Sequence, residues 1–232
     1  MTFQETGVLF EEANQLLEPG YLPIETGFYR LSNGHMHLAV LTRMPRCKGK
    51  MIDWWFGYID DAGKYKMWEP RSHVAFQWDE NREPERYLGA SCIVKRRLGR
   101  RLVNFKLYFH DPSEFLDSSR FDEAGVGTVI CANAYDSENV PQGRMIHFVR
   151  DTDYGCEMRS RFWLIKASDD ECLELMQHCV EEMGNLADFL PELYIKKKRG
   201  LNSNPSHSRK PKTGSHLDSD LSQGQRDDDM LG

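Results

Sequence analysis

One histidine and one glutamate stand four residues apart in the segment "HCVEE", near the end of the apolar part of the chain. These residues are His178 and Glu182. Residues at positions i and i+4 of a helix lie about 6 Å apart, so the two side chains could bind one metal cation together. By spacing alone, the more common explanation is a surface pair that adds a few tenths of a kcal/mol to helix stability. The pair is a candidate metal site that other residues must support.

The pair belongs to the long helical pattern "ASDDECLELMQHCVEEMGNLADFLPELYIKKK". Ser168 or Asp169 can cap the start of this helix, and three lysines suit its C-terminal end. We expect Pro191 to bend or end the regular part. At 3.6 residues per turn, His178 and Glu182 fall on a flank between the apolar face and the charged face. The pattern therefore predicts neither full burial nor full exposure for them.

Two other histidines have surroundings that suit a site. His73 follows an X-Pro turn at the end of "MIDWWFGYIDDAGKYKMWEPRSH", whose aromatic residues could line an apolar pocket or form a cluster at a sheet edge. His147 lies in "GRMIHFVRD", on a strand face that is otherwise apolar, where a hydrogen-bonded core histidine is the usual case. Both residues are candidates that need a structural context.

The elements that would position these residues are mostly strands. Short runs rich in Val, Ile, Phe, Tyr and Trp follow one another from residue 51 to 165, which favours an antiparallel sheet. A helix is expected over residues 8–17, and a short helix capped by Asp111 is expected in "DPSEFLDSSRFDEAG". In "GCEMRSRFW", Glu157, Arg159 and Arg161 share one strand face, as an outward ladder of salt bridges or as the lining of a polar pocket.

The composition limits the class of protein. The chain has 232 residues, 40% of them hydrophobic, a net charge of -6 and only short basic clusters, which argues against a general nucleic-acid binder. No run approaches the roughly 18 apolar residues of a membrane helix. Six scattered cysteines without a C-x-x-C pair, and no N-terminal leader, predict reduced thiols in a soluble, cytoplasmic protein. We expect an N-terminal segment at 1–50 packed on a main domain at 51–199, and a disordered polar tail at 200–232.

Six stretches, from about Gly27 to Tyr194, carry a resemblance to a known family. They are "MIDWWFGY", "YKMWEPRSH", "HDPSEF", "GRMIHFVRD", "GCEMRSRFW" and "HCVEEMGNLADFLPELY". With them the sequence resembles the diacetylphloroglucinol hydrolase family, zinc-dependent enzymes that cleave the carbon-carbon bond between an aromatic ring and an acyl group. The resemblance implies an α+β fold of the Bet v 1-like type, a curved antiparallel sheet wrapped around a long C-terminal helix, with a pocket between them.

Residue by residue, the resemblance implies that His73, His178 and Glu182 bind Zn²⁺. With a water molecule, these three ligands would complete a tetrahedral catalytic site. A further glutamate of the family aligns with Lys95 or Arg96 here, and neither of these side chains can bind zinc.

Other positions also follow from the resemblance. Glu157 or Glu114 would replace the missing ligand if the fold brings either one close. Tyr65 and His147 match residues that contact the substrate. The implied reaction is attack of an activated water on a ketone carbonyl, with His147 as the proton shuttle and Tyr65 orienting a substrate oxygen. The partner would be a small-molecule aromatic ketone, and a homodimer is left open.

Two observations keep alternatives open. Phe76 and Phe162 stand where the phloroglucinol-cleaving enzyme has polar side chains, so we expect a different natural substrate. The basic residues in "CIVKRR" suit a second hypothesis, a binding protein that keeps the hydrophobic cavity but has lost full metal binding. A structural oligomer is a third hypothesis, which leaves the aromatic stretch unexplained.

Overall fold

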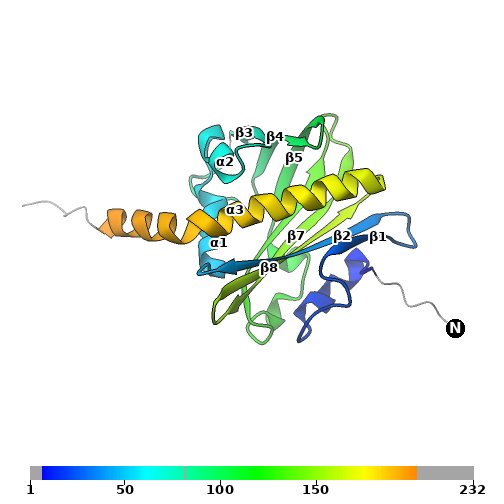
Figure 1. Ribbon diagram of the computed structural model, residues 1–232, viewed down its shortest axis with the longest axis horizontal. Coiled ribbons are helices and arrows are strands. Elements are labelled where there is room, and N and C mark those ends of the chain that lie inside the picture. The colour runs from blue at the N-terminus through cyan, green and yellow to red at the C-terminus, as the bar shows by residue number, and fades with distance from the viewer. Residues whose placement is uncertain (1–6, 81, 203–232) are drawn as a thin grey trace, which may run out of the picture.

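Eight strands form one antiparallel sheet in the computed structural model, which describes residues 7–80 and 82–202 (Figure 1). The strand order is β1-β2-β8-β7-β6-β5-β4-β3. The strands are β1 (Gly27–Arg30), β2 (Met36–Pro45), β3 (His73–Trp78), β4 (Ser91–Leu98), β5 (Arg101–His110), β6 (Val126–Tyr135), β7 (Pro141–Thr152) and β8 (Gly155–Leu164). The helices are η1 (Phe10–Leu17), α1 (Gly49–Tyr58), α2 (Ala62–Trp68), η2 (Pro112–Glu114), η3 (Ser118–Arg120) and α3 (Asp169–Asn202).

The long helix α3 crosses one face of this sheet (Figure 1). Its apolar side packs into the larger hydrophobic cluster, where Cys179 and Met183 meet residues of β8 such as Met158 and Phe162. This confirms the predicted α+β class, an antiparallel sheet packed against a long C-terminal helix. Because α3 runs over this face of the sheet, the polar side chains on its flank, His178 and Glu182, are directed toward β3 and α2.

The opposite face of the sheet is covered by the N-terminal segment and holds a second apolar cluster. On β8, Arg159 and Arg161 point to this face, and both bind the carboxylate of Glu25. The two arginines are 1% exposed, so they form neither an outward ladder nor the lining of a pocket at the α3 face. Strands β1 and β2, in the segment expected to pack on the main domain, belong to the same sheet.

The aromatic stretch after residue 48 forms two helices, α1 and α2, instead of strands. The N-terminus of α1 sits close against β6, where a Cβ atom on Gly49 would lie 2.2 Å from the Gly127 carbonyl carbon. Asp61 caps α2 by accepting a hydrogen bond from the Lys64 N–H at 2.8 Å. The prediction of strands for residues 51–68 was wrong, because a short stretch rich in aromatic residues suits a helix as well as a strand.

Smaller expectations have mixed outcomes. Residues 10–17 form a 3-10 helix, and the region after Asp111 forms two short 3-10 turns. Ser168 caps α3 by accepting from the Glu171 N–H at 3.3 Å. Pro191 does not end α3, which continues to Asn202. Most of the predicted tail lies outside the described residues, and its first residues, 200–202, extend α3.

All six cysteines are buried and unpaired. Within residues 7–80 and 82–202, no helix is both long enough and apolar enough to cross a bilayer.

Candidate metal centre

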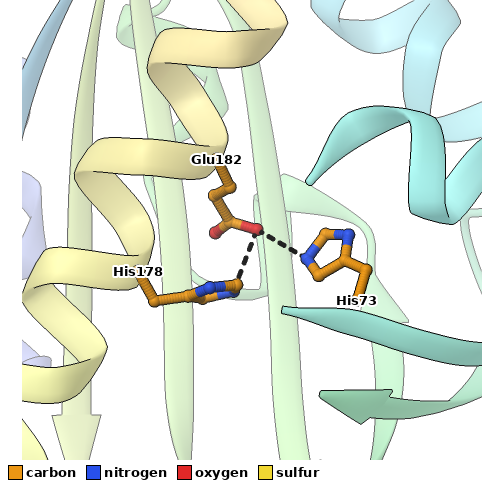
Figure 2. Close-up of side chains that lie close together, drawn as sticks. All are labelled: His73, His178 and Glu182. Carbon is orange, nitrogen blue, oxygen red and sulfur yellow. Dashed lines mark ion pairs between the residues drawn. The ribbon is translucent and has the colours of Figure 1, made fainter. Parts of the chain in front are cut away.

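Three buried side chains converge between α3 and the start of β3. The ligand atoms of His73, His178 and Glu182 all lie within 4.8 Å of one another. The Nε2 atom of each histidine lies 3.3 Å from the Oε2 atom of Glu182. Figure 2 shows that the two imidazoles approach this oxygen from different elements, His178 from α3 and His73 from β3. The structure therefore brings together the three residues predicted as metal ligands.

The other ring nitrogen of each histidine is held by the protein. His73 Nδ1 lies 2.8 Å from the Tyr65 carbonyl oxygen, and His178 Nδ1 lies 3.0 Å from Ser72 Oγ. Apart from their 3.3 Å ion-pair contacts to Glu182, both Nε2 atoms are buried without a hydrogen-bond partner. Buried polar atoms without partners are costly, and metal-binding histidines commonly hydrogen-bond through the distal nitrogen. The donor set of two imidazoles and one carboxylate fits a catalytic zinc site.

Several contacts fix the loop that carries His73 against α3. The buried Glu69 accepts hydrogen bonds from the Arg71 N–H and from the Asn185 side chain of α3. The Trp68 indole donates to the backbone carbonyl of Glu182 at 2.8 Å. The ring of Tyr65 stacks on the His73 imidazole, with ring centroids 3.7 Å apart. These contacts fix the position of the start of β3 relative to α3.

The centre is buried and contains an ionised carboxylate. His73, His178 and Glu182 are 3%, 4% and 4% exposed. Burial alone would raise the pKa of Glu182, but His178 and His73 hold this pKa well below its usual value. Glu182 is therefore ionised at neutral pH and can bind a cation. The helical wheel left His178 and Glu182 on a flank because α2 and β3, which bury that flank, cannot be read from α3 alone.

The two alternative carboxylate ligands are not at this centre, which corrects that expectation. Glu157 lies on the face of β8 opposite to α3, where it accepts hydrogen bonds from Tyr21 at 2.8 Å and Tyr154 at 2.6 Å. Glu114 is exposed in η2 and lies 2.8 Å from His110 Nδ1. The strand parity of Glu157 and the surface turn of Glu114 direct both carboxylates elsewhere.

Of the two basic candidates, Arg96 faces the centre and Lys95 does not. Arg96 pairs with His73 in the β3–β4 register. Its side chain lines a small inner pocket that also contains Glu182 and His147. Lys95 lines a hollow over β3, β4 and β5 that includes Gln77 and Ile93 and does not reach the centre. No ion pair joins Arg96 to Glu182 within the described part of the chain.

Tyr65 and His147, predicted as catalytic, both line the inner pocket, whose volume is about 50 Å³. His147 Nδ1 lies 2.8 Å from Ser160 Oγ, which leaves Nε2 to exchange a proton with a bound ligand. Burial lowers the pKa of His147 to about 4. Burial also raises the pKa of Tyr65. At neutral pH the pocket therefore presents a neutral imidazole and a neutral phenol beside the candidate metal site.

Sequence reasoning missed the residues that orient the ligands, chiefly Ser72, Glu69 and Asn185. Two of these three stand in "WEPRSH", the turn that directly precedes His73. A short polar residue, Ser72, and an acidic residue, Glu69, in the turn before a candidate ligand could have indicated side chains that orient the ligands. Asn185 lies one turn beyond Glu182 on α3 and could not have been paired with Glu69 from the sequence.

Comparison with known proteins places these residues in a family context. A family model described as DAPG hydrolase PhiG domain matches residues 8–169, which include His73 and Arg96 but end before His178. A 2,4-diacetylphloroglucinol hydrolase of Pseudomonas sp is 25% identical over 221 residues, covering 79% of this chain and 75% of that protein. A phloretin hydrolase of Eubacterium ramulus is 26% identical over 226 residues, covering 84% and 80%.

Among solved structures, a major latex-like protein of Panax ginseng aligns with 66% of this chain and 96% of its own at 10% identity, with a TM-score of 0.47. The family model covers well over half of the 232 residues. The chain therefore belongs to the DAPG hydrolase PhiG domain family.

Proposed function

We propose that the protein is a zinc-dependent hydrolase that cleaves the carbon-carbon bond between the ring and the acyl group of a phenolic ketone. The observation that carries this proposal is the convergence of two buried histidine Nε2 atoms, both without hydrogen-bond partners, on the carboxylate of Glu182. The names of the relatives, a diacetylphloroglucinol hydrolase and a phloretin hydrolase, support the same class of substrate.

His73, His178 and Glu182 would hold the zinc ion. Bound there, zinc would supply Lewis-acid polarisation of a ketone carbonyl and activation of a water molecule for attack. The neutral imidazole of His147 would accept a proton and return it to the ring carbon as the bond to the acyl group breaks. Tyr65, fixed by stacking on His73, would donate a hydrogen bond to a substrate oxygen.

The lining of the inner pocket supports an apolar ketone group beside Glu182. Phe56, Trp68, Phe76 and Trp78 line this pocket and offer it apolar contact surface. The apolar rings of Phe76 and Phe162 contribute surface without hydrogen-bond donors, so the substrate ring would carry fewer polar groups on those sides.

Metal analysis and hydrolysis of acylphenols test the proposal together. We expect close to one zinc per purified chain, and loss of both zinc and hydrolysis in His178→Ala. The matched control is Glu114→Ala, which removes an exposed carboxylate outside the pocket and should keep both properties. No zinc uptake after incubation with the metal, in wild-type protein that is folded by circular dichroism, would refute the metal assignment.

The alternative is a binding protein that keeps the cavity without the chemistry, and the position of Arg96 favours it. A positive charge in the pocket that holds Glu182 lowers the affinity of the centre for a cation. A ligand-induced rise in melting temperature, together with no turnover of any acylphenol in the presence of zinc, would support the binder. Zinc-dependent turnover would exclude it.

A further inference from the structure

Arg96 occupies the junction of two cavities. It lines the inner pocket with Glu182 and His147. It also lines an outer cavity between the first turns of α3 and strands β4, β5, β7 and β8, with Phe162 and Leu175. Leu107 and Met145 are shared by both cavities, so the two spaces adjoin beside the Arg96 side chain.

The charge of Arg96 is not neutralised by the protein. Within the described residues, the guanidinium forms neither an ion pair nor a hydrogen bond, and its Nε atom is buried without a partner. Its one specific contact is the face of Phe105, 5.4 Å from the guanidinium carbon to the ring centroid. By contrast, Arg101 at the rim of the outer cavity is bound by Glu171 and Glu174.

Arg96 is half-buried, and its buried Nε atom has no hydrogen-bond partner in the free protein. A buried donor without a partner is unfavourable. Such a cost is removed when a ligand supplies an acceptor. The planar fork of Nε and Nη donors matches the two oxygens of a carboxylate.

The volumes of the two cavities indicate where the ring and the acyl group of a substrate would lie. The outer cavity has a volume of about 140 Å³ and the inner pocket about 50 Å³. A cavity of roughly 150 Å³ holds one benzene ring. A substrate ring therefore fits the outer cavity, with its acyl group in the inner pocket beside Glu182. Arg96 would then lie beside a ring substituent next to the acyl group.

We propose that Arg96 is a specificity-determining residue that binds a carboxylate on the aromatic ring of the substrate. The substrate class is then an acylphenol that also carries a ring carboxylate. Lys166 at the rim of the outer cavity favours entry of an anion. The identity of the substrate rests on the proposed hydrolase function, whereas the carboxylate site can be tested without turnover.

The test compares two ligands that differ in charge, 2,4-dihydroxybenzoate and 2,4-dihydroxybenzamide, by titration calorimetry. We expect the wild-type protein to bind the benzoate at least about tenfold more tightly than the benzamide. Arg96→Gln should abolish this preference, and Arg96→Lys should keep part of it. Lys95→Gln is the matched control, because it removes the same charge from the adjacent residue on the other face of β4.

A carboxylate could also bind zinc, so the titration is repeated with His178→Ala. A preference that persists in this variant and disappears in Arg96→Gln supports the site. Equal affinity of the wild-type protein for both ligands, or an unchanged preference in Arg96→Gln, would overturn the inference. If the preference holds but no acylphenol is hydrolysed, the hydrolase proposal fails and the carboxylate site stands.

With hydrolysis established, the same residue is tested by kinetics. At saturating zinc, Arg96→Gln should raise KM about tenfold for an acylphenol with a ring carboxylate, and by a much smaller factor for the matching carboxamide. An equal loss on both substrates would indicate a structural role and would contradict the assignment.

Discussion

Ser72 Oγ lies 3.0 Å from His178 Nδ1, so the residue before one histidine orients the other. The loop that begins β3 thus presents His73 directly and sets the ring of His178 on α3 through a hydrogen bond. Two neighbouring residues, Ser72 and His73, thus contribute to the placement of both imidazoles, although His73 and His178 are 105 residues apart in sequence. With zinc bound as proposed, Ser72 would influence the metal affinity without contacting the metal.

Ser72→Ala is expected to weaken zinc binding about tenfold to a hundredfold, because the His178 ring loses its hydrogen-bond partner and rotates more freely. The measurement is competition with a chromophoric chelator. Ser137→Ala, in an exposed loop, is the control and should bind zinc as the wild-type protein does. Equal affinities in the two variants would show that Ser72 does not orient the ligand.

The sequence was sufficient for the α+β class, because a long amphipathic helix and successive strands leave clear periodic patterns. The three candidate ligands came from the resemblance to the hydrolase family, since the spacing of His178 and Glu182 alone favoured a surface pair. The full burial of Glu182 did not follow, because it depends on α2 and β3, which pack against α3 from distant parts of the chain. The stretch from Met51 gave the wrong element because its aromatic residues suit a strand as well as a helix, and their packing against α3 and the sheet cannot be read from the stretch itself.

The alternative ligand Glu157 shows a further limit. Strand parity correctly separates Glu157 and Arg159 from Ser160 on β8, but it does not tell which face meets α3. The N-terminal segment buries the charged face through Glu25, and this pairing joins residues 134 positions apart. Long-range pairing of this kind leaves no local signal in a single sequence.

Glu25→Gln is expected to reduce the free energy of unfolding by about 3–5 kcal/mol, because Arg159 and Arg161 remain buried without a counter-charge. Urea denaturation measures the change. Glu18→Gln removes an exposed partner of Arg120 and should change the free energy of unfolding far less than Glu25→Gln does. Similar losses in both variants would contradict a buried pair at Glu25.

His37 should make the protein less stable in mild acid. Burial lowers its pKa to about 4, the nearby charge of Arg161 adds to this, and Glu25 opposes it. Since the usual pKa is about 6.5, the unfolded chain takes up a proton first as pH falls. The stability contributed by the neutral ring is complete above pH 6.5 and is lost toward pH 4, at a cost of roughly 3 kcal/mol.

His37→Gln isolates this contribution, because other groups titrate equally in both proteins. The difference in unfolding free energy between wild type and His37→Gln should change by this amount between pH 7 and pH 4 in urea titrations. Parallel curves over that range would show that His37 is not buried as a neutral ring.

Arg96→Glu is expected to raise zinc affinity at least about tenfold over the wild-type protein, with Arg96→Gln between the two. The reason is electrostatic: the substitution replaces a cation in the pocket of Glu182 with an anion, and charges in a site of low dielectric interact strongly. Chelator competition measures the affinity. Lys95→Glu is the control, because it makes the same change of charge on the face of β4 opposite to Arg96. The same variant should lose the preference for 2,4-dihydroxybenzoate, since two carboxylates repel each other. Zinc affinity that follows total charge alone, equal in Arg96→Glu and Lys95→Glu, would contradict the placement of Arg96 beside the centre.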